Sequence, residues 1–550
     1  MAHGSNIDAC LFMSHIGFSA IACGVSRRFL RSLLVLATLT GIPLATAAAN
    51  AQTSPPPLPP TPSPSPPLSP GDKASASESP AAPSAGQTPE PPAATASSPP
   101  FVAPTAPASA SAPADEKPSE PFAFGDFGWL NGANRQHRAL LDSPVFTGSF
   151  LLDLNYAFSF NHPIDDTVVG STALSRSDEL TIQFVGFGGD FHWEHARGRV
   201  MTQFGYRATQ IPRNDNSTNK GQFDPPTALR YISEAYGGYH WDEMHGVNVD
   251  IGIFMSYVGL FSYAAFENWA YQPSYTSDNT PWFFNGIRLQ MYPSDVFKGE
   301  LWLINGWQSY GVFNEVPGVG FQVLYRPVEA FEILSNGYVG WDTGDNPGRM
   351  RVHSDNSLEL RYYNSPKSFF HRAGFSLTID FGFENGDGVT GFGGSGKEYA
   401  ANSNVGGSGC TNETPCTQNF LSGMFYHRMW FFNEKIGWTF GGGVMHNPGR
   451  YLVLAPTGAA TPGTPITGFD MSAGTKFDSW DASTTLDWMP DEVQTWRLEF
   501  VQREASVPYF AGHGGVTSPD GYITTAVPGG WRPDLVKTES KIIGALLIRF

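Results

Sequence analysis

The feature that most constrains the fold is an alternation of apolar and polar side chains over long segments. In VFTGSFLLDLNYAFSFN, residues 145–161, one face of an extended chain is aromatic and aliphatic, and the other carries all the Thr, Ser, Asp and Asn residues and is polar except for its apolar Val145, Leu151 and Ala157. A period of two residues indicates a β-strand with one apolar and one polar side. Strands of soluble proteins average about five or six residues. A run of this length therefore predicts a tilted strand that crosses a membrane, with lipid outside and water inside.

Comparable segments follow along the rest of the chain. They lie near residues 178–193, 198–210, 228–240, 246–256, 282–292, 297–309, 318–326, 329–342, 356–364, 370–384, 418–432, 435–446, 474–488, 492–504 and 538–550. With the first they make sixteen, which predicts an all-β fold, a transmembrane antiparallel up-and-down β-barrel of sixteen strands. A buried strand of a soluble sandwich is the alternative for any one segment, and the repetition of the pattern argues against it.

The connections between these segments alternate between short and long. Tight turns such as HARG, RPVE and MPDE separate long polar stretches, which lie near residues 161–177, 211–227, 257–281, 310–317, 343–355, 385–417, 447–473 and 505–537. This alternation is typical of outer-membrane barrels, whose short turns face the periplasm and whose longer loops face outward. An even number of strands predicts that the N-terminal segment and the C-terminus are both periplasmic.

The chain before the barrel has two regions of different composition. Residues 1–51 contain a basic segment, an apolar stretch and small residues, which predict a secretory signal peptide. The stretch before the first arginine is long, so either translation starts later or the signal carries an extension. A membrane-spanning helix at 33–51 is disfavoured by the glycine, proline and alanines in it. Residues 52–118 hold 21 of the 45 prolines, so we expect a disordered Pro/Ala/Ser-rich linker before a barrel domain at 119–550.

Charge and motifs exclude several classes of function. The formal net charge is −17, whereas a nucleic-acid-binding protein would carry basic patches. The motifs HExxH, GxSxG and a phosphate loop ending in GKS or GKT are absent, so we predict no enzyme and no cofactor. The cluster HWDEMH at 240–245 is expected to be a solvated turn, and no metal site is predicted. The uncharged run at 251–266 is shorter than a membrane-spanning helix, which excludes a helical inner-membrane protein.

Two cysteines lie close together in a polar loop, in the sequence GCTNETPC. In an oxidising compartment, Cys410 and Cys416 predict a local disulfide. A zinc site would need two further ligands nearby, which the loop does not offer.

The third long connection, 257–281, is unusually rich in aromatic residues: Tyr257, Phe261, Tyr263, Phe266, Trp269, Tyr271 and Tyr275. Exposed to water, these side chains would leave a large apolar area unburied. We expect the loop to fold into the lumen, and packing on the rim is the alternative. Folded inward, Trp269 and Tyr271 would narrow the passage, and Glu267 and Asp278 would bring acidic groups into it.

Charged residues on the polar strand faces are expected to point into the lumen, because an arginine facing lipid at mid-depth costs about 2–4 kcal/mol. The pattern places Arg207, Arg288, Arg372 and Arg361 on the inner wall. We predict that Arg207, Arg288 and Arg372 face the acids of the loop. These charges would either line a channel or only pair across the lumen, and the sequence leaves both open.

The chain ends in KIIGALLIRF, a strand with Ile542, Leu546, Ile548 and Phe550 on one face. This face resembles the C-terminal signal by which barrel-assembly machinery recognises outer-membrane barrels. The isoleucine and leucine side chains are expected to face lipid, and Phe550 to join a periplasmic aromatic girdle.

Residues 120–550 resemble the OmpL-like putative β-barrel porins of Gram-negative outer membranes. The resemblance is carried by FAFGDFGWLNG at 122–132, by the long stretch at 231–295, by LINGWQSYG at 303–311, and by HNPGRYLVL at 446–454. It implies a porin-like barrel.

The resulting functional prediction is an outer-membrane porin for passive diffusion of small polar solutes or ions. The alternative is a structural or adhesive barrel that acts through its external loops and tether. Expected partners are outer-membrane lipid and lipopolysaccharide, the barrel-assembly machinery, the solutes, and further copies of the chain by analogy with trimeric porins; nucleic acid is not among them.

Overall fold

The computed structural model describes residues 120–550, except residues 216, 218–219, 313–315, 345, 395–409, 455–468 and 470–471. The expected signal peptide and proline-rich linker lie outside the described residues.

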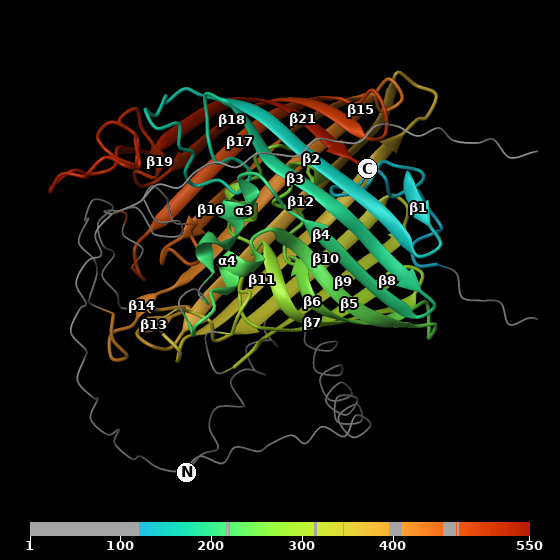
Figure 1. Cartoon of the computed structure of the whole chain (residues 1–550), viewed down its shortest axis with the longest axis horizontal. Helices are drawn as coiled ribbons and strands as arrows, with labels where there is room; N and C mark the ends of the chain where they lie inside the picture. The colour runs from blue at the N-terminus through green and yellow to red at the C-terminus, as the bar shows by residue number, and fades with distance from the viewer. Residues whose placement is uncertain are drawn as a thin grey trace, which may run out of the picture. The chain divides into compact units, whose positions relative to one another are not determined.

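Sixteen antiparallel strands form a closed barrel (Figure 1). They are β2 (Phe146–Ser159), β3 (Leu180–Trp193), β4 (Ala196–Thr202), β5 (Ile232–Trp241), β6 (Val247–Met255), β7 (Phe283–Ser294), β8 (Phe297–Ile304), β9 (Gly318–Val328), β10 (Phe331–Gly340), β11 (Met350–Asn364), β12 (Phe370–Asn385), β15 (Asn419–Phe431), β16 (Ile436–Asn447), β17 (Phe477–Trp488), β18 (Gln494–Ala505) and β21 (Thr538–Arg549). Each strand pairs with the next along the chain, and β21 closes the ring by pairing with β2, where Leu154 lies opposite Leu546. The predicted fold class is confirmed.

The alternation of the sequence sets which face of each strand is inside. On β11 the buried positions run from Arg351 to Arg361 at every second residue, and all of them are polar or charged. On β17 the buried Asp481 and Asp487 alternate with exposed Trp480 and Trp488. Apolar side chains therefore cover the outer surface and polar side chains cover the inner wall, as a membrane barrel requires.

The remaining elements are short. They are β1 (Leu141–Ser143), α3 (Arg207–Gln210), η1 (Ile211–Asn214), α4 (Pro225–Leu229), η2 (Ala265–Glu267), α5 (Tyr275–Asp278), and the small pairs β13 (Val389–Thr390) with β14 (Cys416–Thr417) and β19 (Phe510–Ala511) with β20 (Leu535–Val536). The part of the chain that the structure describes contains no helix long and apolar enough to cross a membrane.

The two largest differences from the predicted strand boundaries are at β4 and β11. The expected strand at 198–210 ends at Thr202, because Gly205 takes a φ of 88° and turns the chain into α3. A side chain at position 205 would also meet the Ile182 carbonyl at 2.6 Å. The strand predicted at 356–364 begins earlier, at Met350, because the alternation continues through its buried Arg351 and His353.

Short turns gather at one end of the barrel, which we call the turn side, and long connections gather at the other, the loop side. The turn side carries the first residue of β2 and the C-terminal Phe550, whose amide donates to the Phe150 carbonyl at 2.8 Å. In Figure 1 the C-terminus lies near β1, at the same end of the barrel. The lumen is not empty: apolar clusters join the inner wall to the connections that fold inward, and they position the site described next.

Candidate functional site: the lumen and its loop

The connection between β6 and β7, residues 256–282, crosses the barrel interior, and we call it the lumen loop. The backbone amides of Tyr271 and Gln272 donate to the two carboxylate oxygens of Glu499 on β18, at 2.5 and 2.8 Å. The hydroxyl group of Tyr271 donates to Asp153 on β2 at 2.8 Å. Because β2 and β18 lie four and six strands away from β6 around the ring, these contacts confirm that the loop folds inward.

The tip of the lumen loop is fixed to β17 and β18. The Ser274 hydroxyl group and the Tyr275 amide both donate to Asp481, at 2.7 and 3.0 Å. Asp278 forms an ion pair with Arg503, whose guanidinium lies 3.9 Å from the centre of the Tyr275 ring. All of these side chains are buried, so the tip is held by charge-assisted hydrogen bonds rather than by apolar packing alone.

Close approach of the loop tip to the wall depends on a glycine of β16. A Cβ atom at Gly443 would lie 2.3 Å from the Ser274 hydroxyl oxygen. Any larger residue would displace the loop tip or the neighbouring strand, so the absence of a side chain at position 443 makes room for α5.

The residues before the barrel also enter it from the turn side. We call residues 121–138 the N-terminal strap. The side chain of Asn131 accepts from the Trp269 amide at 2.8 Å and donates to the Leu260 carbonyl at 2.9 Å, while its own amide donates to Glu359 on β11 at 2.9 Å. One buried asparagine thus joins the strap, the lumen loop and the wall. Trp129, fully buried beside it, donates its indole N–H to the Glu329 carbonyl at 3.0 Å.

The strap is anchored near two neighbouring turns of the turn side, the β15–β16 turn and the β17–β18 turn. Asp126 forms an ion pair of 2.8 Å with Arg372, which also pairs with Glu434 at 2.8 Å. Partial burial raises the pKa of Asp126, but the Gly128 amide and the positive charge of Arg372 outweigh it, and the pKa falls below its usual value. Further along, Arg135 donates to the Asp491 and Gln494 carbonyls at 2.9 Å.

The sequence-predicted residues fall into two groups. Trp269 and Tyr271 lie in the lumen, as the loop does, and both are buried. Arg288 and Arg361 lie on the inner wall, but they pair with Asp250 and Glu329, and Arg372 pairs with the strap. The loop acids have other partners than predicted: Asp278 pairs with Arg503, and Glu267 lies 3.7 Å from Arg549.

Arg207 lies on α3 and not on the strand that the sequence predicts at 198–210. It is fully buried, its Nη1 atom donates to the Thr172 carbonyl, and its guanidinium lies 5.0 Å from the centre of the Tyr263 ring. Its Nε and Nη2 atoms find no hydrogen-bond partner among the described residues. Because the chain turns at Gly205, Arg207 lies among the side chains that fill the lumen and not on the barrel wall.

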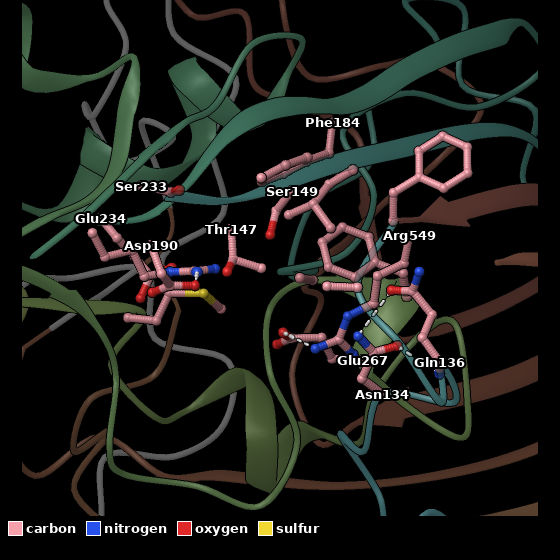
Figure 2. A pocket seen from close by; sticks show the side chains of 18 of the residues that line it. Asn134, Gln136, Thr147, Ser149, Phe184, Asp190, Ser233, Glu234, Glu267 and Arg549 are labelled. Atoms are coloured by element: carbon pink, nitrogen blue, oxygen red, sulfur yellow. Dashed lines mark hydrogen bonds and ion pairs between the residues drawn. The ribbon is translucent and has the colours of Figure 1, made fainter. Parts of the chain in front are cut away.

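A cavity of about 590 Å³ lies at the turn side, between the strap, the lumen loop and the wall of β2–β5. Arg199 bridges Asp190 and Glu234 at 2.6 Å each on one side, and Arg549 faces Glu267 on the other (Figure 2). The hydroxyl groups of Thr147 and Ser149 lie between these two groups in the view. We call this space the turn-side cavity; it offers hydrogen-bond donors and acceptors of both charges to a solute.

Other candidate chemistry is limited. Among the described residues, no group of three or more His, Cys, Asp or Glu side chains could hold a metal ion. Cys410 and Cys416 are joined by a disulfide, and β14 begins at Cys416 beside β13.

Sequence reasoning did not name Asp481, Arg503 or Arg199, although they anchor the loop or line the cavity. The signal was present, because Asp481 and Arg503 continue the inward alternation of β17 and β18. The pattern does not indicate which inward-facing residue contacts which of the segments inserted into the lumen.

A closed sixteen-stranded barrel with an apolar outer face, a charged lumen and an inserted loop defines an outer-membrane barrel of the porin type. The chain belongs to the family described as putative beta-barrel porin-2, OmpL-like, whose model matches residues 146–527. Its location is accordingly the bacterial outer membrane. The stretch at 122–132, part of the strap, precedes the matched range. No curated protein matches the chain significantly in sequence.

Solved structures with a similar fold include the outer membrane channel DcaP of Acinetobacter baumannii, at 10% identity and a TM-score of 0.42, covering 74% of this chain and 97% of that one. An anion-selective porin from Comamonas acidovorans matches at 9% identity and a TM-score of 0.40, covering 74% and 99%. OprB of Pseudomonas putida matches at 11% identity and a TM-score of 0.40, covering 74% and 94%.

Proposed function

We propose that this protein is a passive porin through which small polar solutes or ions diffuse, with the lumen loop as its constriction. The observation that carries the proposal is the turn-side cavity, a polar space inside the barrel whose wall includes Glu267 of the lumen loop. A passage lined by paired acids and bases provides hydrogen bonds to polar solutes and none to apolar ones.

The residues proposed to line or narrow the passage are those of the loop and the wall. Glu267 borders the cavity directly, and Trp269 and Tyr271 continue the loop across the lumen. Arg207, Arg288, Arg361, Arg372 and Asp278 supply the surrounding charge. Truncation of Trp269 or Tyr271 to alanine is expected to widen the lumen and raise the conductance.

Single-channel recording of the purified full chain in planar bilayers tests this function. Discrete current steps whose size grows with salt concentration would support a water-filled passage. Their repeated absence from several folded preparations would contradict it. Swelling of liposomes that contain the protein, in solutions of neutral sugars, would measure uncharged solutes independently of ion current.

A second candidate is a structural or adhesive barrel that acts through its external loops and tether. The observation that favours it is the burial of the loop interior: Tyr271, Ser274 and Thr276 are entirely shielded from solvent, as in a packed core. Loss of surface attachment by cells lacking the protein, with no change in solute uptake, would support this alternative.

In the membrane, the turn side is proposed to face the periplasm and the loop side the exterior. The barrel-assembly machinery is proposed to recognise the outward face of β21, which carries Ile542, Leu546, Ile548 and Phe550. Phe550 lies 5.9 Å from Phe150, centre to centre, at the turn side, where an aromatic girdle is expected. Reduced insertion of a Phe550→Ser variant, measured by surface proteolysis of whole cells, would support this role.

A further inference from the structure

Two phenylalanines from different elements form one wall of the turn-side cavity. Phe184 belongs to β3 and Phe266 to η2 of the lumen loop, and both line the cavity. Their ring centres lie 5.5 Å apart at an interplanar angle of 77°, an edge-to-face contact. Figure 2 shows Phe184 above Ser149, and both lie between the charged groups at the two sides of the cavity.

A β-bulge places Phe184 there. The pairing of β2 with β3 shifts register between Asp153 and Leu154, so that two consecutive residues, Gln183 and Phe184, are both buried. Without the bulge, one of them would face lipid. Bulges often re-aim a side chain beside a functional site. Gly186 leaves room for the ring, since a Cβ atom there would lie 2.5 Å from a ring atom of Phe184.

Two buried charged side chains, Arg207 and Asp153, lie near the two rings, and each keeps polar atoms without a hydrogen-bond partner among the described residues. Phe184 packs in one apolar cluster with Tyr263, over whose ring Arg207 lies. Asp153 is the register partner of Phe184 on β2 and is also fully buried. Among the described residues, Arg207 Nε, Arg207 Nη2 and Asp153 Oδ2 have no hydrogen-bond partner. Buried polar groups without partners are costly, so water or a passing solute is needed to satisfy them.

We propose that Phe184 and Phe266 form an aromatic gate between the turn-side cavity and the Arg207–Asp153 region, and that this gate limits passage along the β2–β3 wall. The inference rests on the proposed porin function and assigns its narrowest point. An apolar constriction excludes water when its rings touch and admits it when they separate. Phe266 is only partly buried, while Arg497 holds the backbone on either side of it through the Ala265 and Asn268 carbonyls, at 3.1 and 2.8 Å, so the ring opens by side-chain rotation with the backbone fixed.

The solutes favoured by this arrangement carry both a hydrogen-bond acceptor and a donor. Arg207 would bind a carboxylate or another oxygen acceptor, and Asp153 would bind an ammonium or hydroxyl donor. Small zwitterions and polyhydroxy compounds fit these requirements, whereas a solute with a single charge would leave one of the two groups unpaired.

The gate is tested by truncating each ring in the full chain. Phe184→Ala and Phe266→Ala are each expected to raise the single-channel conductance roughly twofold or more, because the constriction widens. Phe187→Ala is the matched control: this residue lies three positions further along β3, faces lipid and is 54% exposed, so the current should be unchanged. If the wild-type protein conducts and neither truncation alters its current, the gate is wrong while the porin function stands.

A second measurement does not depend on current. The Gln183 side chain donates to Gln210 at 3.0 Å, and Gln210 accepts from Arg207 at 3.2 Å, so a cysteine introduced by Gln183→Cys lies on the Arg207 side of the gate. A cysteine introduced by Ser149→Cys lies in the cavity. A small methanethiosulfonate reagent is expected to modify the Ser149→Cys variant in every background. It should modify the Gln183→Cys variant only when Phe266 is alanine, with the labelled peptide identified by mass spectrometry. Equal labelling of position 183 with and without Phe266 would overturn the gate, even if no preparation carried current.

Discussion

The Tyr271 hydroxyl group donates a hydrogen bond of 2.8 Å to the Asp153 carboxylate, and both residues are fully shielded from solvent. The bond joins the lumen loop to β2, the strand that closes the barrel with β21. The same hydroxyl group accepts from the Asn155 side chain at 2.8 Å. The hydroxyl group of Tyr271 therefore connects the lumen loop to a strand at which the barrel closes.

Replacing Tyr271 with phenylalanine removes these two hydrogen bonds and keeps the ring. Because Asp153 and Asn155 would remain buried without this partner, the free energy of unfolding should fall by about 1–3 kcal/mol. Urea unfolding of the detergent-solubilised protein, followed by tryptophan fluorescence, measures it. Tyr156→Phe on the outward face of β2 is the control and should unfold like the wild type. Equal stability of the two variants would mean that the buried contact contributes nothing.

The two acids of the lumen loop should differ in their effect on ion selectivity. Glu267 borders the turn-side cavity and lies 3.7 Å from Arg549, whereas Asp278 is buried against Arg503. Glu267→Gln should therefore shift the reversal potential toward anions under a salt gradient, because it leaves Arg549 unopposed beside the passage. Asp278→Asn should shift it less and destabilise the loop more. A larger shift from Asp278→Asn would mean that ions pass the loop tip and not the cavity.

The strands could be predicted because each carries its own signal. Alternation at 145–161 or 370–384 depends only on local sequence and on the contrast between lipid and lumen, and the structure has strands at each predicted segment. The inward folding of the lumen loop was predictable for a similar reason, since its aromatic residues need burial wherever they lie.

The partners inside the lumen could not be predicted. Arg372 pairs with Asp126, 246 residues away in sequence, and Asp278 pairs with Arg503, 225 residues away. Such pairings depend on where inserted segments cross the barrel, which no local periodicity contains. A single glycine, Gly205, also ended β4 and moved Arg207 off the wall. A bulge at Gln183 likewise altered one side chain's direction without altering the average pattern.

The cysteines of the loop side are expected to be oxidised in the cell. Cys410 and Cys416 close a small ring, six residues apart in sequence, so the bond should order its own loop and add little to barrel stability. Maleimide labelling of intact, unreduced cells should leave both residues unmodified, and labelling after reduction should modify both. Modification without reduction would contradict the disulfide. The melting temperature should change little on reduction.

Limited proteolysis of the folded protein is expected to stop near Pro121. The sequence of residues 52–118 predicts an accessible chain. From Phe122 onward the backbone is held, since the Phe122 amide donates to the Asp295 carbonyl at 2.7 Å and Trp129 is buried in the lumen. Mass spectrometry of the resistant core locates the boundary. A core that retains residues before 100 would indicate that the linker is docked rather than accessible.

The strap should control how firmly the lumen loop is held. Asn131→Ala removes the side chain that accepts from the Trp269 amide and donates to the Leu260 carbonyl, and both backbone groups lie in the interior. Two unsatisfied groups should cost about 2 kcal/mol or more, and should loosen the loop beside its aromatic contact between Trp269 and Trp430. Asn134→Ala is the control for the urea midpoint, because that side chain bonds with Gln136 of the same strap; it is no control for the current, since Asn134 lines the turn-side cavity. We expect Asn131→Ala alone to lower the urea midpoint, and we expect it to raise the conductance or its noise. An unchanged urea midpoint and an unchanged current would mean that the strap does not stabilise the lumen loop. Glu499 and Asp481 would then be sufficient to fix the loop.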